Sequence, residues 1–154
     1  MGFYQKKTSQ LVNAPLDEVW DFISSPANLK EITPDHMGFD ITSKDILEKM
    51  YPGMIISYIV KPMLNIPTTW VTEITHVVEK EFFVDEQRIG PYSMWHHEHR
   101  LTPQGDKTLM EDIISYQPPF GFLGSIANAL FIKRQLNSIF EYREEAVKKR
   151  FPGS

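Results

Sequence analysis

The segment Trp95-His96-His97-Glu98-His99 has the most unusual local composition in the chain. Alternate side chains of a β-strand point to opposite faces, so Trp95, His97 and His99 share one face. Because Trp95 is apolar, we expect this face to point inward and to carry both imidazoles with it. An inward imidazole can hydrogen-bond a carbonyl or hydroxyl group of a ligand, or act as a general base near neutral pH.

A carboxylate and a phenol on the following strand share a second inward face. Asp112 and Tyr116 are in phase with apolar Met110, and antiparallel pairing would place Asp112 near one of the histidines. Three interpretations of this polar patch stay open. In the first, His97 or His99 hydrogen-bonds a ligand. In the second, one of them is the general base of a cyclase, with Tyr116 as proton donor. In the third, these groups only satisfy one another's hydrogen bonds in the core.

A metal site is a further interpretation of the same residues. His97, His99 and Asp112 are suitable ligand types for zinc or a similar ion. Two histidines at positions i and i+2 of a strand are a weak signature, however, and we predict no bound metal and no cofactor. With 0 cysteines, the chain cannot form a thiolate zinc site, an iron–sulfur cluster or a cysteine nucleophile. The sequence also lacks a glycine-rich phosphate loop, a G-x-S-x-G elbow and an H-E-x-x-H pair.

The overall composition is that of one soluble globular domain spanning 1–154. With 42% hydrophobic and 23% charged residues, the 154 residues suffice for one core and are too few for two ordinary domains. The net charge of −4 gives no general attraction to phosphate, so we predict no nucleic-acid partner. The apolar stretch 121–132 is shorter than the roughly 20 residues of a membrane span, which predicts no integral membrane association. The polar N-terminal segment predicts a cytoplasmic location.

The order of hydrophobic patterns predicts an α+β domain. Alternating and β-branched runs indicate strands, and apolar residues spaced by three or four indicate helices. We expect a first strand at 3–12 and two short helices at 16–23 and 26–32, with prolines at their beginnings. The remaining elements are expected as strands at 37–41, 54–61, 68–78, 82–89, 92–102 and 107–117, and as one long helix at 122–149. We expect the charged tail of this helix, 143–150, to be solvated.

Several motifs together resemble the START-like or SRPBCC superfamily, and in particular its bacterial ligand-binding or polyketide-cyclase-like subgroup. The motifs are Trp70-Val71-Thr72-Glu73-Ile74, Phe83-Val84-Asp85-Glu86-Gln87, Gly90-Pro91-Tyr92, the set Trp95, His97, His99, Thr108, Met110, Asp112 and Tyr116, then Pro119-Phe120-Gly121 and Leu123-Gly124. The resemblance implies the helix-grip fold shared with the birch pollen allergen. In that fold a curved antiparallel sheet of about seven strands wraps around a long C-terminal helix, and two short helices follow the first strand. A cavity for an apolar ligand lies between them.

We therefore predict binding or carriage of a small hydrophobic ligand, such as a lipid, a polyketide or an aromatic compound. The catalytic candidates of the cyclase, aromatase or dehydratase alternative are His97, His99, Asp112 and Tyr116. A third hypothesis is a protein-binding or stress-related factor with a filled cavity, which an exposed apolar patch at Met63, Leu64 and Ile66 would support. Each residue predicted to bind the ligand could instead be an ordinary core residue. These residues are Trp70, Phe83, Asp85, Trp95, His97, His99, Met110, Asp112, Tyr116, Phe120, Leu123, Ala127 and Leu130.

Overall fold

The computed structural model describes residues 3–46, 48–62 and 65–153. It contains strands and helices in nearly the order that the hydrophobic patterns predict. The first part consists of β1 (Tyr4–Val12), α1 (Leu16–Ile23), the 3-10 helices η1 (Pro26–Lys30) and η2 (Asp35–Met37), and β2 (Asp40–Ile41). The sheet continues with β3 (Met54–Val60), β4 (Thr68–Val78), β5 (Phe82–Ile89), β6 (Met94–Gln104) and β7 (Lys107–Gln117). The chain then forms α2 (Gly121–Ala127), η3 (Asn128–Ile132) and α3 (Lys133–Arg150).

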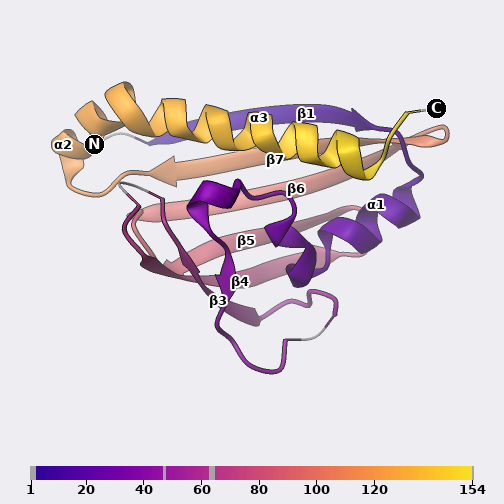
Figure 1. Ribbon diagram of the computed structural model, residues 1–154, viewed down its shortest axis with the longest axis horizontal. Coiled ribbons are helices and arrows are strands. Elements are labelled where there is room, and N and C mark those ends of the chain that lie inside the picture. The colour runs from indigo at the N-terminus through magenta and orange to yellow at the C-terminus, as the bar shows by residue number, and fades with distance from the viewer. Residues whose placement is uncertain (1–2, 47, 63–64, 154) are drawn as a thin grey trace.

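Seven antiparallel strands form one sheet in the order β1-β7-β6-β5-β4-β3-β2 (Figure 1). The register between β4 and β5 shifts at Val71/Thr72 and again at Ile74/His76. Such bulges bend and twist a strand, which helps the sheet to curve around its contents. Figure 1 shows the C-terminal helix lying along the sheet beside β1 and β7. The predicted helix-grip architecture is therefore confirmed.

The C-terminal helix is continuous from α2 to α3, but its middle turn, η3, is a π-helix. A π-turn is a rare local insertion, and the sequence analysis did not predict it. Asn128, the first residue of η3, is buried and accepts a hydrogen bond from the Tyr116 hydroxyl at 2.8 Å. In the middle of α2, Gly124 packs so closely that a Cβ atom would collide with the Pro119 carbonyl oxygen. The lack of a side chain at Gly124 therefore allows α2 to pack closely against the Pro119 backbone.

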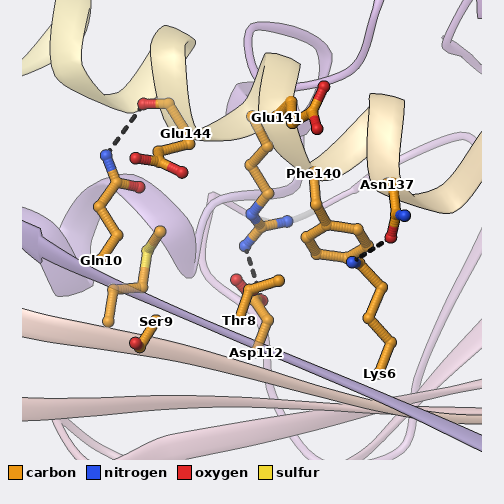
Figure 2. A pocket seen from close by; sticks show the side chains of 11 residues that line it. Lys6, Thr8, Ser9, Gln10, Asp112, Asn137, Phe140, Glu141 and Glu144 are labelled. Atoms are coloured by element: carbon orange, nitrogen blue, oxygen red, sulfur yellow. Dashed lines mark hydrogen bonds and ion pairs between the residues drawn. The ribbon is translucent and has the colours of Figure 1, made fainter.

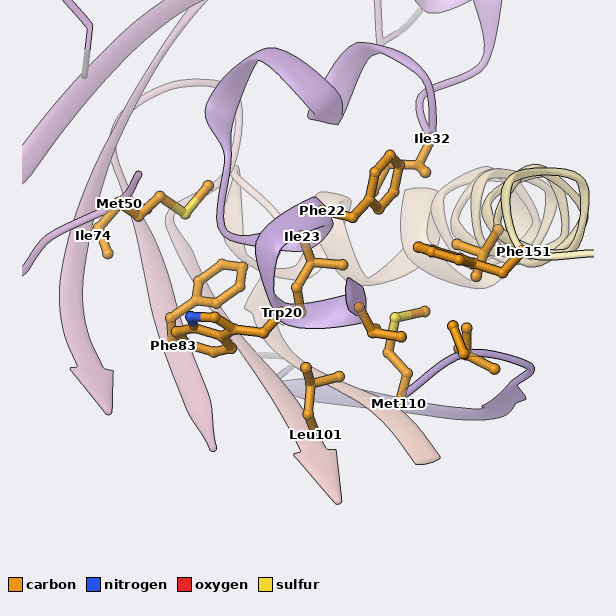
Figure 3. Packing of buried hydrophobic residues seen from close by; sticks show 14 of the residues in the cluster. Trp20, Phe22, Ile23, Ile32, Met50, Ile74, Phe83, Leu101, Met110 and Phe151 are labelled. Carbon is orange, nitrogen blue, oxygen red and sulfur yellow. The ribbon is translucent and has the colours of Figure 1, made fainter. Parts of the chain in front are cut away.

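The main hydrophobic core lies under α1 (Figure 3). Trp20 and Ile23 project from α1 toward the sheet, where Trp20 meets Phe83 edge to face at 6.1 Å between ring centroids. Phe22 makes a similar contact with Phe151, just after α3, at 5.6 Å. This packing fixes the C-terminal end of α3 against α1. The core thus fills the space between the sheet and the C-terminal end of α3, and the remaining space lies toward the middle of α3.

Several elements differ from their predictions. The second short helix, expected at 26–32, is the 3-10 helix η1, which ends at Lys30. The strand expected at 37–41 is reduced to the two residues of β2, because η2 ends at Met37 and Gly38 has a φ of 61°. The hairpin between β6 and β7 is tighter than expected, since Gln104 already pairs with Lys107. Pro103 fits into β6 because pairing with β5 ends at Arg100, so its missing N–H is not needed there. In the part of the chain that the structure describes, no helix combines the length and apolar character that crossing a membrane requires.

Candidate functional site

Three neighbouring strands bring two carboxylates and two imidazoles to one inward patch. Asp85 of β5 lies opposite His97 of β6, and His99 of β6 lies opposite Asp112 of β7. Strand alternation turns both histidines inward, where 6% of His97 and 3% of His99 remains exposed. We call Asp85, His97, His99 and Asp112 the His–Asp cluster.

Each imidazole of the His–Asp cluster faces both carboxylates. His97 Nε2 is 2.8 Å from Asp112 Oδ1, and its Nδ1 is 3.7 Å from Asp85 Oδ2. His99 Nε2 is 2.6 Å from Asp85 Oδ2, and its Nδ1 is 3.2 Å from Asp112 Oδ1. The two rings stack with centroids 3.7 Å apart, and Phe83 stacks on His99 at 4.1 Å. The four side chains therefore form a closed ring whose geometry is fixed from the core side.

Arg143 of α3 provides a permanent cation beside the His–Asp cluster. Its Nη2 is 3.2 Å from Asp112 Oδ1 and 3.3 Å from His99 Nδ1. The expectation that the tail 143–150 is solvated is wrong for this residue, which is only 8% exposed. Helical spacing is the signal that identifies it, since Arg143 follows Phe140 by three residues on the buried face of α3.

Arg143 and the imidazoles keep both carboxyl groups of the cluster ionised. Burial acts to raise the pKa of Asp112, but Arg143 and the two histidines lower it well below its ordinary value. Burial also acts to raise the pKa of Asp85, and the hydrogen bond from His99 and the imidazole charges outweigh it and lower the pKa. Burial lowers the pKa of His97, whereas hydrogen bonds to Asp112 and Asp85 outweigh burial at His99 and raise its pKa. Of the two imidazoles, His97 therefore gives up its proton more readily.

An inner cavity of about 160 Å³ lies between the sheet and α3, with Asp85, His97 and His99 at its polar end. Leu136 and Ile139 line it from the helix side. An apolar cavity of roughly 150 Å³ holds one benzene-sized molecule. Five aromatic side chains form the opposite wall, with neighbouring ring centroids between 4.5 and 6.2 Å apart: Phe39, Tyr58, Trp70, Tyr92 and Trp95.

A wider outer groove adjoins the inner cavity near the start of α2. It measures about 660 Å³ and shares Pro62, Tyr92 and Gln135 with the inner cavity. Phe120, Leu123 and Ala127 line it, together with Gly90, Pro91, Pro119, Gly124 and Ile132. Ligand pockets commonly enclose about 300–1,000 Å³. The outer groove falls within that range, so the two spaces together suit a ligand longer than a single ring.

A separate side cavity of about 180 Å³ lies between β1 and α3 (Figure 2). It is polar: Lys6 Nζ donates to Asn137 Oδ1 at 2.7 Å, and Gln10 donates to the Glu144 carbonyl oxygen at 2.9 Å. Two residues predicted to contact the ligand, Met110 and Asp112, line this side cavity and not the inner one. Arg143 lines both cavities and forms part of the partition between them.

The remaining predicted site residues divide between the cavity wall and other positions. Trp70, Asp85, Trp95, His97 and His99 line the inner cavity, and Phe120, Leu123 and Ala127 line the outer groove. Three others line neither space. Phe83 lies in the core against Trp20, the Tyr116 hydroxyl is committed to Asn128, and Leu130 is 61% exposed on the outer side of η3. Sequence analysis missed the wall residues Phe39, Tyr58, Tyr92 and Leu136, whose alternating or helical spacing could also indicate ordinary core.

Large apolar side chains are exposed along α2 and η3. They include Phe122, Ile126, Leu130 and Phe131. The patch predicted at Met63, Leu64 and Ile66 falls partly outside the described residues, and of its three members the structure describes Ile66, which is exposed. An apolar probe can therefore contact two kinds of surface on this protein, the inner cavity and the exposed side of the helix.

The geometry can be compared with known proteins. The sequence profile of a family described as polyketide cyclase/dehydrase and lipid transport matches residues 12–140. A search of curated protein sequences finds no match. A START superfamily protein from Mycobacterium smegmatis has a similar structure, with 14% identity, a TM-score of 0.72 and 97% of each chain covered.

Two other solved structures also resemble this chain. Ginseng major latex-like protein 151 from Panax ginseng has 11% identity and a TM-score of 0.71, covering 98% of this chain and 99% of that chain. The Zhui aromatase/cyclase from Streptomyces sp. R1128 has 13% identity and a TM-score of 0.69, covering 97% of this chain and 96% of that chain. At such low identity these likenesses show a shared fold.

Proposed function

The chain belongs to the polyketide cyclase/dehydrase and lipid transport family, and we propose that it binds a small amphipathic molecule between its sheet and its C-terminal helix. The observation that carries this proposal is the inner cavity, which is walled by aromatic rings and ends at Asp85, His97 and His99. Ligand sites typically combine such an apolar wall with a few convergent polar groups. The ring or chain of the ligand would occupy the inner cavity and extend into the outer groove.

The polar end of the cavity favours a ligand that carries a hydroxyl or carbonyl oxygen. Among the described residues, Arg143 Nε is a buried donor without a hydrogen-bond partner. Leaving such a donor unsatisfied costs about 1–3 kcal/mol, and an oxygen atom of a ligand can accept its hydrogen bond. The Asp85 carboxylate is partly open to the cavity and can accept from a ligand hydroxyl. A phenol, an enol or a keto group therefore matches this end better than a saturated hydrocarbon.

Binding or carriage is better supported than the cyclase alternative. A catalytic base needs an imidazole nitrogen that faces the substrate. In the described structure each ring nitrogen of His97 and His99 lies within 3.7 Å of Asp85, Asp112 or Arg143. Three of these four nitrogens are engaged by protein groups at 2.6 to 3.2 Å, and His97 Nδ1 faces the Asp85 carboxylate at 3.7 Å. We therefore propose that the cluster orients the oxygen of a bound lipid, polyketide or aromatic molecule.

Titration with 4-bromophenol tests the proposal, because this probe matches the inner cavity in size and its bromine quenches tryptophan fluorescence on contact. Trp70 and Trp95 line the cavity, whereas Trp20 packs in the main core. We expect saturable quenching in the wild type and in Trp20→Phe. We expect little quenching of the remaining Trp20 in the double variant Trp70→Phe/Trp95→Phe. Equal, non-saturable quenching of all three proteins would mean that the probe does not enter the cavity.

A further inference from the structure

The exposed side of the C-terminal helix carries a patch of large apolar side chains at one end of the molecule. Figure 1 shows α2 at this end, beyond the end of β7. Between 49% and 81% of each side chain remains exposed. Apolar patches on the surfaces of soluble proteins commonly mark a site of contact with a partner or a membrane. We call this set the helix patch, and its members are Phe120, Phe122, Leu123, Ile126, Leu130 and Phe131.

The backbone at Phe120 is a second observation at the same place. Its φ of 67° lies in the left-handed region, which is uncommon for a bulky side chain. Such conformations raise the energy of the folded chain, and they cluster at functional sites. The ring of Phe120 is 81% exposed, so its burial in this fold does little to offset that energy. A partner that buries the ring would offset it.

The charge of this part of the chain is opposite in sign to that of the whole protein. The segment 113–140 contains no aspartate or glutamate and two basic residues, Lys133 and Arg134, whereas the net charge of the chain is −4. Arg134 follows Leu130 by four residues, so it continues the same side of the helix. Both basic side chains are exposed, and in the described parts of the chain neither forms an ion pair.

These charges distinguish a membrane from a second copy of the chain. A two-fold contact between copies would place the helix patch of one against the helix patch of the other. Lys133 and Arg134 of both copies would then approach one another, and the segment 113–140 has no carboxylate to pair with them. Anionic lipid headgroups supply the missing negative charge, and the acyl boundary beneath them accepts apolar side chains. Charge complementarity therefore favours an anionic bilayer.

We propose that the helix patch docks the protein on the surface of a bilayer that contains anionic lipids. The apolar side chains enter the boundary between headgroups and acyl chains, and Lys133 and Arg134 lie among the headgroups. Phe120 and Leu123 also line the outer groove, so the groove opens beside the bilayer. The other four members of the patch line neither the outer groove nor the inner cavity. Docking therefore does not depend on a ligand in the inner cavity.

Co-sedimentation with vesicles of phosphatidylcholine and phosphatidylglycerol tests the docking. Ile126→Ser/Leu130→Ser should bind about 10- to 100-fold more weakly than the wild type, because two apolar side chains no longer leave water on binding. The matched control is Leu11→Ser/Ile55→Ser, which makes the same substitutions at side chains of β1 and β3 that are 51% and 49% exposed. The control should bind vesicles as the wild type does.

Lys133→Gln/Arg134→Gln tests the contribution of charge. Loss of two basic residues at an anionic surface should weaken binding to these vesicles by roughly 10- to 30-fold. Binding to vesicles of phosphatidylcholine alone should not change. Lys148→Gln/Lys149→Gln removes two positive charges at the other end of α3 and should retain the wild-type affinity. Equal losses in the two charge variants would contradict docking through the helix patch.

Spin-labelled lipid in bicelles locates the contact in the wild type, should a variant not fold. We expect the methyl resonances of Ile126 and Leu130 to broaden and those of Leu11 and Ile55 to stay sharp. The opposite pattern, no binding of the wild type to anionic vesicles, or equal binding of the two serine variants would overturn the proposal. So would a dimer, formed without lipid, that only Ile126→Ser/Leu130→Ser abolishes, because a second copy would then cover the patch.

The vesicle experiment is independent of the proposed ligand binding. The helix-patch variant Ile126→Ser/Leu130→Ser should retain wild-type quenching by 4-bromophenol, since neither residue lines the inner cavity. Loss of vesicle binding with unchanged quenching in this variant supports docking through the helix patch. Failure of docking and failure of ligand binding are therefore distinguishable.

Discussion

Val60→Phe should weaken 4-bromophenol binding by about 10- to 100-fold. Val60 is buried at the end of β3 and lines the inner cavity beside Phe39 and Trp70. A phenyl ring at this position would fill the space that the ring of the probe needs. Burying a side chain of this size contributes about 1.5–3 kcal/mol, and each 1.4 kcal/mol corresponds to about tenfold in affinity. The measurement is the dissociation constant from tryptophan quenching.

Val78→Phe provides the matched control for this substitution. This variant carries the same valine-to-phenylalanine substitution on β4. Val78 is 41% exposed and does not line the inner cavity. Its affinity for the probe should equal that of the wild type. Thermal unfolding of both variants checks that each remains folded. Equal affinities of the Val60→Phe variant and the wild type would show that the probe binds elsewhere.

Arg143→Met should lower the free energy of unfolding by about 3–5 kcal/mol. Removing one partner of a buried ion pair leaves the other charge uncompensated, and this is the range of that penalty. Asp112 would lose its cation while still buried beside a second carboxylate, Asp85. Methionine preserves much of the apolar length of the side chain, so packing changes less than charge. Urea unfolding measures the effect.

Arg88→Met is the matched control for the loss of an arginine. Arg88 pairs with Glu73 at 2.9 Å but is exposed, and such pairs contribute about 0–1 kcal/mol. Adding Asp112→Asn to Arg143→Met should recover part of the lost stability, because the uncompensated charge is then removed. Equal losses in the two arginine variants, or no recovery in the double variant, would contradict the role given to Arg143.

The fold could be predicted largely because strong local patterns coincide with clear boundaries. The bounds of β4, β5 and β7 equal the predicted ranges, since alternation of apolar residues ends at turn residues in each case. The strand at 37–41 was less well specified. Its alternation is genuine, but a positive φ at Gly38 and the 3-10 turn before it leave only two residues to pair. Tertiary context therefore overrides a short pattern.

The candidate site could be predicted only in part. The face of the sheet to which a side chain points follows from the sequence, but the distance between side chains on different strands does not. The phase of Trp95 indicates that His97 and His99 turn inward, as they do. No local pattern states that Asp85 meets the same imidazoles from β5, because this depends on the register between strands. Arg143 was overlooked since a charge within a charged tail suggests solvent exposure. Cavity volume depends on how the aromatic rings pack, which spacing alone does not determine.

Intermolecular nuclear Overhauser effects between the ring protons of 4-bromophenol and assigned side chains test the central claim most directly. If the protein binds its ligand between the sheet and α3, the ring protons should show contacts to Trp70, Trp95 and Leu136, which line the inner cavity from both sides. Contacts confined to Phe122 and Phe131 on the exposed face of the C-terminal helix would contradict the claim, because the probe would then bind to the surface.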